Sequence, residues 1–307
     1  MSSSGPSAKK KLSLVLLAVE NNDYQAAQVA SAQKAAGILG VDLQILHIQH
    51  DAVAQSQLVL QLLQRPPEKR ASGILFEPVG TPLAQAAKIA AASGVAWVVL
   101  NRALDYAAEL RRQYPTPLFS VSTSHVEVGK IQGQQIARLL SGGGTVLYIQ
   151  GPADNTASAQ RAAGMESTKP VNAEVRSLRG LWTEQSAYQA TTSWLKLGLA
   201  KKHVIEVVAG QNDAMALGAR KALQENTSGG EGNRWMSIPY LGCDGLPGTG
   251  QKAVKDGFLT ATVVIPPNAG KAIEAVVSAI RTGKQPAECI YTSPTSYPPL
   301  ESLRLKA

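Results

Sequence analysis

Short apolar runs alternate with Ala-rich helical stretches along almost the whole chain. The first cycle leads from a strand at residues 12–19 into a helix at 24–39, and the second leads from 42–48 into 52–64. Strands that alternate with helices of about 10 to 15 residues predict right-handed βαβ units, which build a mainly parallel sheet. We therefore expect an α/β fold of the doubly wound kind.

The later cycles fall into two series. In the first half, strands are expected at 73–76 and 95–100 around a helix at 82–92, and the polar segment 105–117 ends this half. Residues 226–233 are predicted as a loop from their composition, and the Pro-containing stretch 291–299 is predicted as an extended strap across the surface. The second half repeats the scheme, with further elements expected at residues 126–140, 145–150, 157–168, 174–178, 184–197, 204–209, 214–224, 238–242, 249–255, 260–265 and 270–281.

The chain is long enough for two cores. Its 307 residues exceed the usual size of a single core, so two lobes of roughly 130 to 150 residues each are expected. Residues 1–10 are expected to form a disordered tail. The apolar run at 12–19 follows three lysines, as in a signal peptide, but the run is short and residues 20–23 replace the small-residue cleavage site. We interpret it as a buried first strand.

Charge and cysteine content limit the partners of the chain. The 30 basic and 22 acidic residues leave a net charge of +8, and the basic residues are scattered apart from two short clusters at 9–11 and 111–112. A nucleic-acid-binding protein concentrates its charge on one face beside a recognisable motif, so no nucleic-acid partner is expected. Cys243 and Cys289 are too few for a disulfide scaffold and leave the compartment undecided.

The motifs of common α/β enzymes are missing or broken. Residues 245–252 resemble a phosphate-binding loop, but Gln251 replaces the lysine and Ala253 replaces the Ser or Thr that binds magnesium. No GxGxxG follows the first strand and no GxSxG elbow occurs. His47 and His50 would point to different faces at a strand end, and His125 and His203 are solitary. The sequence therefore predicts no enzyme, no cofactor and no metal site.

One segment suggests a binding site. An apolar strand from residue 207 runs into Asn212 and Asp213 and then into a helix of small residues. Asn and Asp both favour helix starts, because their side-chain oxygens accept hydrogen bonds from free backbone N–H groups. Both residues could cap the helix, or one could cap while the other faces a ligand at the carboxyl end of the strand. The segment alone leaves both possibilities open.

Several segments, taken in order, resemble a known family. They are residues 20–24 (ENNDY), 74–78 (ILFEP), 97–102 (WVVLNR), 129–133 (GKIQG), 149–151 (IQG) with Arg161 and Gly164, 211–218 (QNDAMALG), 242–247 (GCDGLP), and 253–257 (AVKDG) with Ala261 and Thr262. The series resembles the type I periplasmic sugar-binding proteins of the ribose-binding type, which are related to the effector core of the lactose-repressor family. It covers the chain from about residue 12 to 283.

This resemblance implies two doubly wound parallel-sheet lobes joined by a three-crossing hinge. The crossings would fall near Thr123, Ile265 and Thr292, which gives an N-terminal lobe of 11–123 plus 266–292 and a C-terminal lobe of 124–265 plus 293–307. The ligand would lie in the cleft between the lobes, which close about the hinge. In such a site aromatic rings cover the C–H faces of a sugar, while carboxylate, amide and guanidinium groups bind its hydroxyls.

Position by position, the resemblance assigns ligand-binding roles to residues of both lobes. They are Asn22 and Tyr24 in the first-lobe loop, Glu77, Asn101 and Arg102 at strand ends, Thr123 at a crossing, and Arg161, Trp182, Asn212 and Asp244 in the second lobe. Trp182 would form an aromatic wall, and Asn212 would contact the ligand while Asp213 caps the helix. Without the resemblance, Arg161 could be a surface residue, Trp182 a core residue and Asp244 a helix cap.

Five positions depart from the ribose-binding pattern. Asn101 stands where a carboxylate usually precedes Arg102, while Glu77 stands where an amide is usual. Gln25 and Cys243 occupy positions that are often phenylalanine, and Ile265 occupies a hinge position that is often glutamine. Fewer rings and a relocated acid imply a ligand other than ribose: a different monosaccharide, a polyol, or a larger or phosphate-free sugar derivative.

The resemblance implies a monomeric solute receptor that delivers a carbohydrate to the permease of an ABC-type importer. Such a receptor would be periplasmic if an export signal has been removed, and cytoplasmic if the chain is complete as written. The alternative is a sugar-sensing effector domain of a transcriptional or signalling regulator. A regulator of the lactose-repressor type needs about 60 residues of helix-turn-helix ahead of the core, whereas about 11 precede the first strand here.

Overall fold

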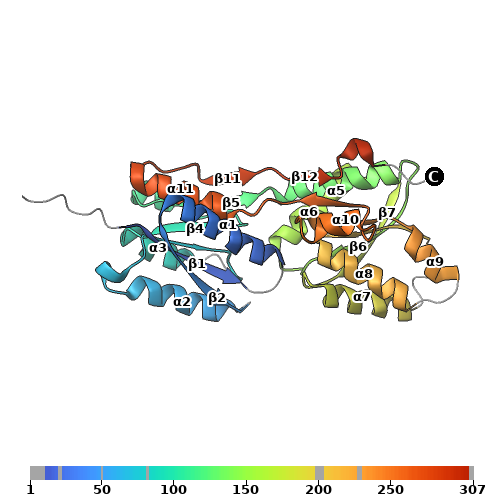
Figure 1. Cartoon of the computed structure of the whole chain (residues 1–307), viewed down its shortest axis with the longest axis horizontal. Helices are drawn as coiled ribbons and strands as arrows, with labels where there is room; N and C mark the ends of the chain where they lie inside the picture. Colours follow the sequence, from blue (N-terminus) through green and yellow to red (C-terminus); the bar gives the residue numbers. More distant parts are fainter. Residues whose placement is uncertain are drawn as a thin grey trace, which may run out of the picture. The chain divides into compact units, whose positions relative to one another are not determined.

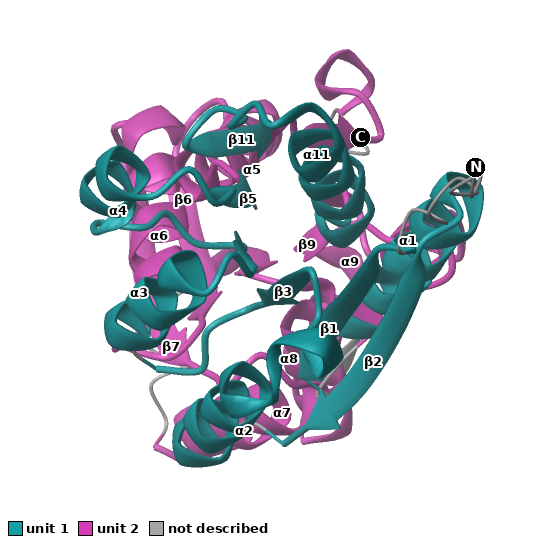
Figure 2. Cartoon of the chain, turned by 90° about the vertical axis from the view of Figure 1, so that its left-hand side faces the viewer, with its two compact units in different colours: residues 1–21, 25–122, 267–291 teal, residues 22–24, 123–266, 292–307 magenta. Residues whose placement is uncertain are grey.

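The computed structural model describes residues 11–19, 23–49, 51–80, 83–197, 204–226 and 230–303, without the side chains of 230–233. The chain divides into two compact units (Figure 2). Unit 1 comprises residues 1–21, 25–122 and 267–291, and unit 2 comprises 22–24, 123–266 and 292–307. The predicted tail at 1–10 and the residues Asn22, His50 and His203 lie outside the described residues.

Unit 1 is built on a six-stranded sheet in the order β11-β5-β4-β3-β1-β2. Figure 1 labels the strands β1, β2, β4, β5 and β11 of this sheet. Its strands are β1 (Ser13–Val19), β2 (Asp42–Ile48), β3 (Gly73–Phe76), β4 (Ala96–Leu100), β5 (Leu118–Thr123) and β11 (Cys289–Thr292). Its helices are α1 (Asp23–Leu39), α2 (Ala52–Gln64), α3 (Ala84–Ala92), α4 (Ala107–Gln113) and α11 (Ala269–Thr282), with a 3-10 turn at Pro67–Lys69. Strands β1 to β5 pair in parallel.

Helices cover both faces of this sheet. Successive side chains of a strand point to opposite faces, and in β1 Val15 and Leu17 belong to one buried cluster with residues of α2 and α3. Leu14 and Leu16 belong to a second buried cluster with residues of α1 and α11. A strand buried on both faces reads as a continuous apolar run, which explains the sequence of β1.

Unit 2 repeats the arrangement on a six-stranded sheet in the order β12-β10-β9-β8-β6-β7. Its strands are β6 (Gly144–Gln150), β7 (Ala173–Arg179), β8 (Ile205–Gly210), β9 (Tyr240–Asp244), β10 (Ala261–Val264) and β12 (Thr295–Tyr297). Its helices are α5 (His125–Leu139), α6 (Thr156–Thr168), α7 (Glu184–Lys196), α8 (Asp213–Glu225), α9 (Gly230–Ser237) and α10 (Gly250–Lys255), with a 3-10 turn at Leu300–Ser302. Edge strand β12 is antiparallel to β10, and the other pairs are parallel.

The first strand of each unit lies inside its sheet. Strand β1 lies between β2 and β3, and β6 lies between β7 and β8. The direction of winding reverses at this point, and ligands of open α/β sheets bind beside such reversals, at the carboxyl ends of the strands. Functional side chains are therefore expected where β3, β4, β6, β8 and β9 end.

The predicted α/β class with two doubly wound sheets is confirmed, and three segments refine it. The polar segment 105–117 contains α4, and β5, which was not predicted, follows it. The loop prediction for 226–233 is wrong from residue 230 onward, where α9 begins, because Trp235 anchors this helix in the unit 2 core. The stretch 291–299 is extended as predicted, but it contributes to the edge strands β11 and β12.

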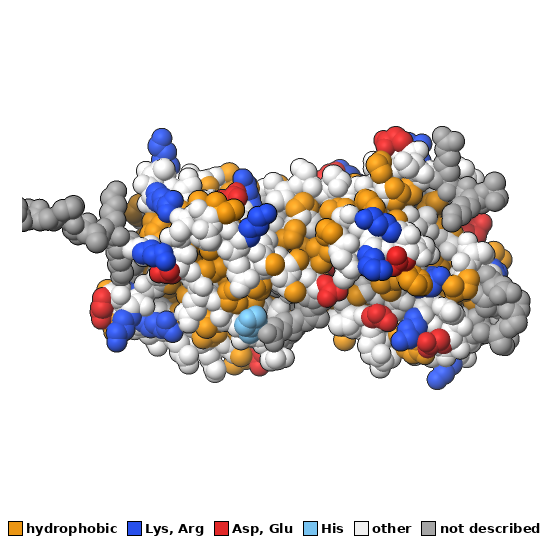
Figure 3. Space-filling model, viewed as in Figure 1, with side chains coloured by type: hydrophobic (Ala, Val, Ile, Leu, Met, Phe, Trp, Pro, Cys, Tyr) orange, Lys and Arg blue, Asp and Glu red, His pale blue; other side chains and the backbone are white. Residues whose placement is uncertain are grey.

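Surface and thiol features bear on possible partners. On the face drawn in Figure 3, Lys and Arg side chains are interspersed with Asp and Glu instead of gathering into one patch. None of the described helices is long and apolar enough to cross a membrane. Cys243 is buried and Cys289 is partly exposed, and both are free thiols.

Glycines allow α5 and α6 of unit 2 to pack closely. A Cβ atom on Gly129 of α5 would lie 2.1 Å from the carbonyl oxygen of Arg161 on α6. A Cβ on Gly164 of α6 would lie 2.1 Å from the carbonyl oxygen of Val126 on α5. Because neither position has room for a side chain, the spacing of the helices depends on both glycines and also sets the position of Arg161.

We predict opposite effects for two helical glycine-to-alanine substitutions. Gly164→Ala should lower the free energy of unfolding by about 1–3 kcal/mol, because the added methyl group overpacks the helix contact. Gly37→Ala in α1, where an added methyl group would meet nothing within 4 Å, should raise it by about 0.5–1 kcal/mol. Urea denaturation of both variants measures the difference, and equal effects would contradict the packing argument.

Candidate functional site

Polar side chains gather at the carboxyl ends of β3 and β4 in unit 1. Glu77 follows β3 and Asn101 follows β4. The Glu77 Oε2 atom accepts from Gln25 Nε2 at 2.7 Å and from Asn101 Nδ2 at 2.9 Å. Asn268 Nδ2 in turn donates to Asn101 Oδ1 at 2.5 Å. We call Gln25, Glu77, Asn101 and Asn268 the unit 1 cluster; two of its amides donate to a single carboxylate, and the third donates to one of those amides.

A buried amide holds the segment that carries Glu77. Gln55 of α2 is fully buried, and its Nε2 donates to the backbone carbonyl of Glu77 at 2.8 Å. Its Oε1 accepts from the backbone N–H of Val79 at 2.9 Å. One side chain thus satisfies two backbone groups after β3, where the ladder of the sheet has ended.

Side chains of α1 fix the start of α11, and with it Asn268. Gln28 Oε1 accepts from Ala269 N at 2.7 Å, and Ser31 Oγ accepts from Gly270 N at 2.7 Å. These bonds replace the missing side-chain cap of α11 by acceptors from another helix. The unit 1 cluster is therefore supported from α1, α2 and α11.

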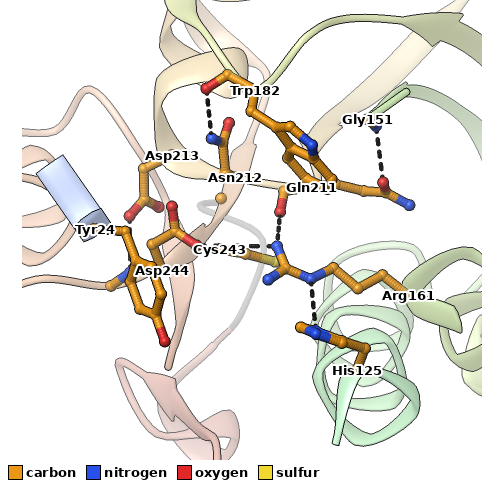
Figure 4. A network of polar contacts seen from close by, with 12 residues as sticks. Tyr24, His125, Gly151, Arg161, Trp182, Gln211, Asn212, Asp213, Cys243 and Asp244 are labelled. Atoms are coloured by element: carbon orange, nitrogen blue, oxygen red, sulfur yellow. Dashed lines mark hydrogen bonds and ion pairs between the residues drawn. The ribbon is translucent and has the colours of Figure 1, made fainter. Parts of the chain in front are cut away.

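In unit 2, Gln211 joins three elements directly after β8. Its Oε1 accepts from Gly151 N at 2.8 Å (Figure 4), while its Nε2 donates to the Ser158 carbonyl at 2.8 Å and to the Tyr148 hydroxyl at 3.2 Å. The side chain is fully buried, so these bonds replace the water that the amide loses. They connect β6, α6 and the start of α8.

Arg161 of α6 is buried, with 7% of its surface exposed, and contacts Gln211, Asp244, His125 and Trp182. We call these five residues the unit 2 polar network. Its Nη1 donates to the Gln211 carbonyl and lies 3.9 Å from Asp244 Oδ1 (Figure 4). Its Nε donates to His125 Nδ1 at 3.4 Å. The guanidinium carbon lies 5.4 Å from the centroid of the Trp182 ring, which is within cation–π range.

Asn212 caps α8. Its Oδ1 accepts from Met215 N at 2.9 Å, and its Nδ2 donates to the Trp182 carbonyl at 2.9 Å. The prediction that Asp213 is the cap is wrong, because the Asp213 side chain bonds residues outside α8. Asn212 is 3% exposed, and its predicted role as a ligand contact stays a prediction.

Asp213 is a buried acid. Its Oδ2 accepts from Gly245 N at 2.8 Å, and its Oδ1 accepts from Thr262 Oγ1 at 2.6 Å. Burial raises the pKa of Asp213 well above its ordinary value, and the negative charge of Asp244 raises it further. The hydrogen bonds from Thr262 and Gly245 and the charge of Arg161 oppose this shift in the pKa.

Three predicted ligand residues have a backbone conformation that L-residues rarely adopt. The φ angles are 59° at Asn101, 64° at Trp182 and 95° at Asp244. Left-handed conformations of non-glycine residues are strained and concentrate at functional sites, where the surroundings hold them. Asn101 and Asp244 occupy equivalent places, at the end of the fourth strand of each unit.

The other predicted residues that the structure describes form hydrogen bonds of their own. The Tyr24 hydroxyl donates to the Pro266 carbonyl at 3.2 Å. Arg102 Nη1 donates to the Gly80 carbonyl at 2.6 Å, and the Thr123 hydroxyl lies 2.6 Å from that of Thr292. The roles of all these residues toward a ligand stay predictions.

Sequence reasoning missed part of both networks. His125 is not solitary, because it accepts from Arg161. Gln211 was given no role, although it lies beside the predicted Asn212 and directly follows a strand. Asp213 was predicted only as a helix cap, and Gln25 was noted only as a departure from the family pattern. Asn268, at the start of α11, follows the predicted hinge residue Ile265 by three positions and carried no signal of its own.

Comparison with known proteins shows which family the chain matches. Residues 14–285 match the family model described as the periplasmic binding protein domain. The chain is 28% identical over 259 residues to the ribose import binding protein of Salmonella typhimurium, which covers 83% of this chain and 79% of that protein.

Solved structures are similar over nearly the full length. A galactofuranose binding protein has a TM-score of 0.79 and 24% identity, covering 93% of this chain and 94% of that chain. The binding protein of an arabinose ABC transporter from Shewanella sp. ANA-3, bound to α- and β-L-arabinofuranose, has a TM-score of 0.78 and 23% identity, covering 92% and 91%. These likenesses confirm the fold.

The raised pKa of Asp213 predicts a pH-dependent stability. Because the folded state binds this proton more tightly than the unfolded state, the stabilising contribution is complete below the ordinary aspartate pKa and is lost as the pH rises through the raised one. The free energy of unfolding of the wild type should therefore fall relative to Asp213→Asn as the pH rises above the ordinary aspartate range, by up to about 1.4 kcal/mol per pH unit. Urea denaturation at pH values from this range upward measures it, with Asp51→Asn as a control; parallel curves for wild type and Asp213→Asn would contradict the assignment.

Proposed function

Because the chain belongs to the periplasmic binding protein family, we propose that it is a solute receptor that binds a monosaccharide or polyol and performs no chemistry on it. The names of the ribose import binding protein and of the galactofuranose- and arabinofuranose-binding structures support a carbohydrate ligand. They support the importer hypothesis and not the regulator alternative. We propose the permease of an ABC-type importer as the partner and the periplasm as the location.

The observation that carries this proposal is the set of groups at the strand ends. Unit 1 offers the Glu77 carboxylate among three amides, and unit 2 offers the Asp244 carboxylate, the Arg161 guanidinium and the Trp182 indole. Carboxylates accept and guanidinium groups donate, so together they bind hydroxyls, which do both. An indole covers the apolar face of a sugar ring.

The unit 1 cluster suggests what distinguishes the ligand from ribose. Two amides donate to Oε2 of Glu77, and within the described part of the chain Oε1 accepts no hydrogen bond. The Asn101 side chain donates one N–H to Glu77, and the side-chain oxygen of Asn101 accepts from Asn268. We propose that Oε1 of Glu77 accepts from a ligand hydroxyl, so that the acid acts from the end of β3 and not from the end of β4.

A thermal-shift panel tests the function. We expect at least one of D-ribose, L-arabinose, D-galactose, xylitol and myo-inositol to raise the melting temperature, because a ligand that binds the native state stabilises it by about 2.7 kcal/mol at a hundred times its Kd. L-Leucine, which carries no hydroxyl group on its side chain, is the control. Asp244→Ala should abolish the shift. A panel without any stabilising compound would refute the proposal, and stabilisation by ribose alone would refute a ligand other than ribose.

A double-mutant cycle tests the arrangement of Glu77 and Asn101. Glu77→Gln should weaken binding of the stabilising compound by about 1.5–3 kcal/mol, because it removes a charged acceptor. Asn101→Asp should also weaken binding, because it sets a second carboxylate against Glu77. The double variant restores one amide and one acid, so its loss should be smaller than the sum. Calorimetric titration measures all three, and additive losses would contradict direct coupling.

A further inference from the structure

The turn after β9 holds two consecutive residues in the left-handed region. Asp244 has a φ of 95° and Gly245 has a φ of 57°. Gly245 cannot carry a side chain, because a Cβ would lie 2.6 Å from the Cα of Val264. Asp244 does carry one, and such a conformation persists only when its surroundings hold it. What holds this turn therefore decides where the Asp244 carboxylate points.

Asp213 holds the turn from a different βα unit. Its Oδ2 accepts from the Gly245 N–H at 2.8 Å, across the peptide bond that follows Asp244. The carbonyl of Asp244 accepts from Ile265 N at 3.0 Å, and the carbonyl of Gly245 accepts from Gln251 Nε2 at 2.8 Å. The Gly245 N–H is thus bonded to a carboxyl oxygen of a residue that lies 32 positions earlier in the chain.

Residues without side chains leave room for the Asp213 carboxyl group. A Cβ on Gly242 of β9 would lie 2.1 Å from Oδ1, and a Cβ on Gly250 of α10 would lie 2.0 Å from Oδ2. Thr262 of β10 bonds the same Oδ1 at 2.6 Å. Two glycines and one hydroxyl from three elements therefore surround a group that is itself 5% exposed.

Asp213 is not needed to start its own helix. Asn212 already caps α8 by accepting from Met215 N, and the Asp213 side chain bonds Gly245 and Thr262 of other elements. Burying an acid costs free energy of folding, so we expect Asp213 to have a role other than capping. We propose that Asp213 is a positioning residue: it holds the Gly245 N–H and thereby fixes the carboxylate of Asp244 in its ligand-binding orientation.

The charged groups around Asp213 fit this role. Asp244 and the Cys243 thiol face it from β9, and Arg161 faces it from α6. The single guanidinium of Arg161 pairs with Asp244 at 3.9 Å. Burial and the Asp244 charge both raise the pKa of Asp213, so this acid takes up a proton more readily than an exposed aspartate does.

The inference rests on the proposed function, in that Asp244 contacts the ligand, and calorimetric titration tests it. D-ribose, L-arabinose, D-galactose, xylitol and myo-inositol are titrated into wild type, Asp213→Ala, Asp213→Asn and the control Asp51→Ala, which removes a carboxylate that caps α2. Asp213→Ala should weaken binding about tenfold to a hundredfold. Asp213→Asn should stay within about threefold, because an amide oxygen can still accept from Gly245. Equal Kd values for wild type and Asp213→Ala, or equal losses in Asp213→Ala and Asp213→Asn, would overturn the proposal.

A ligand-free measurement separates this proposal from the proposed function. In NMR spectra, the Gly245 amide proton of the wild type should shift with pH as Asp213 titrates, above the ordinary aspartate range, and this shift should vanish in Asp213→Asn. A Gly245 amide that does not respond to pH in the wild type would overturn the positioning role, even if Asp213→Ala fails to fold. If none of the five compounds binds the wild type, the receptor function fails while the amide titration still decides the role of Asp213.

Discussion

Burial of a parallel sheet on both faces is the constraint on which the rest of this structure depends. In β1 and β6 alternate side chains enter different apolar clusters, so both faces of these strands are mainly apolar. Polar side chains can therefore gather where the strands end, and there the backbone also loses its ladder partners. Gln55 and Gln211 satisfy this loss with buried amides, and the same bonds hold the segments that carry Glu77 and Arg161.

The two units solve the same geometric problem with different chemistry. Their sheets have the same strand order, and the residue that ends the fourth strand has a positive φ in both. In unit 1 this residue is Asn101, which donates to the Glu77 carboxylate, and in unit 2 it is Asp244, which pairs with Arg161. A repeated backbone therefore presents an amide-bound acid in one unit and a guanidinium-bound acid in the other.

Much of the fold followed from the sequence, because alternation of apolar runs with helical stretches is a local pattern. The strand-end residues Glu77, Asn101 and Asp244 were also identified as candidates, because short segments around them resemble those of a known family. The helix at α9 was missed, because it depends on burial of Trp235 in the core and its first residues are rich in glycine. His125 was dismissed as solitary, although Arg161 reaches it across 36 residues of chain.

By itself, the sequence determined that Asn212 and Asp213 stand between a strand and a helix, and that either could cap it. The tertiary structure decided that Asn212 caps α8 and that the Asp213 side chain bonds Gly245 and Thr262 in the core. The physical reason is the distance in sequence: the partners of Asp213 are Gly245, 32 residues away, and Thr262, 49 residues away. Local preferences are nearly equal for Asn and Asp at a helix start. The choice therefore depends on the buried donors of Gly245 and Thr262, which bond the Asp213 side chain in the folded core.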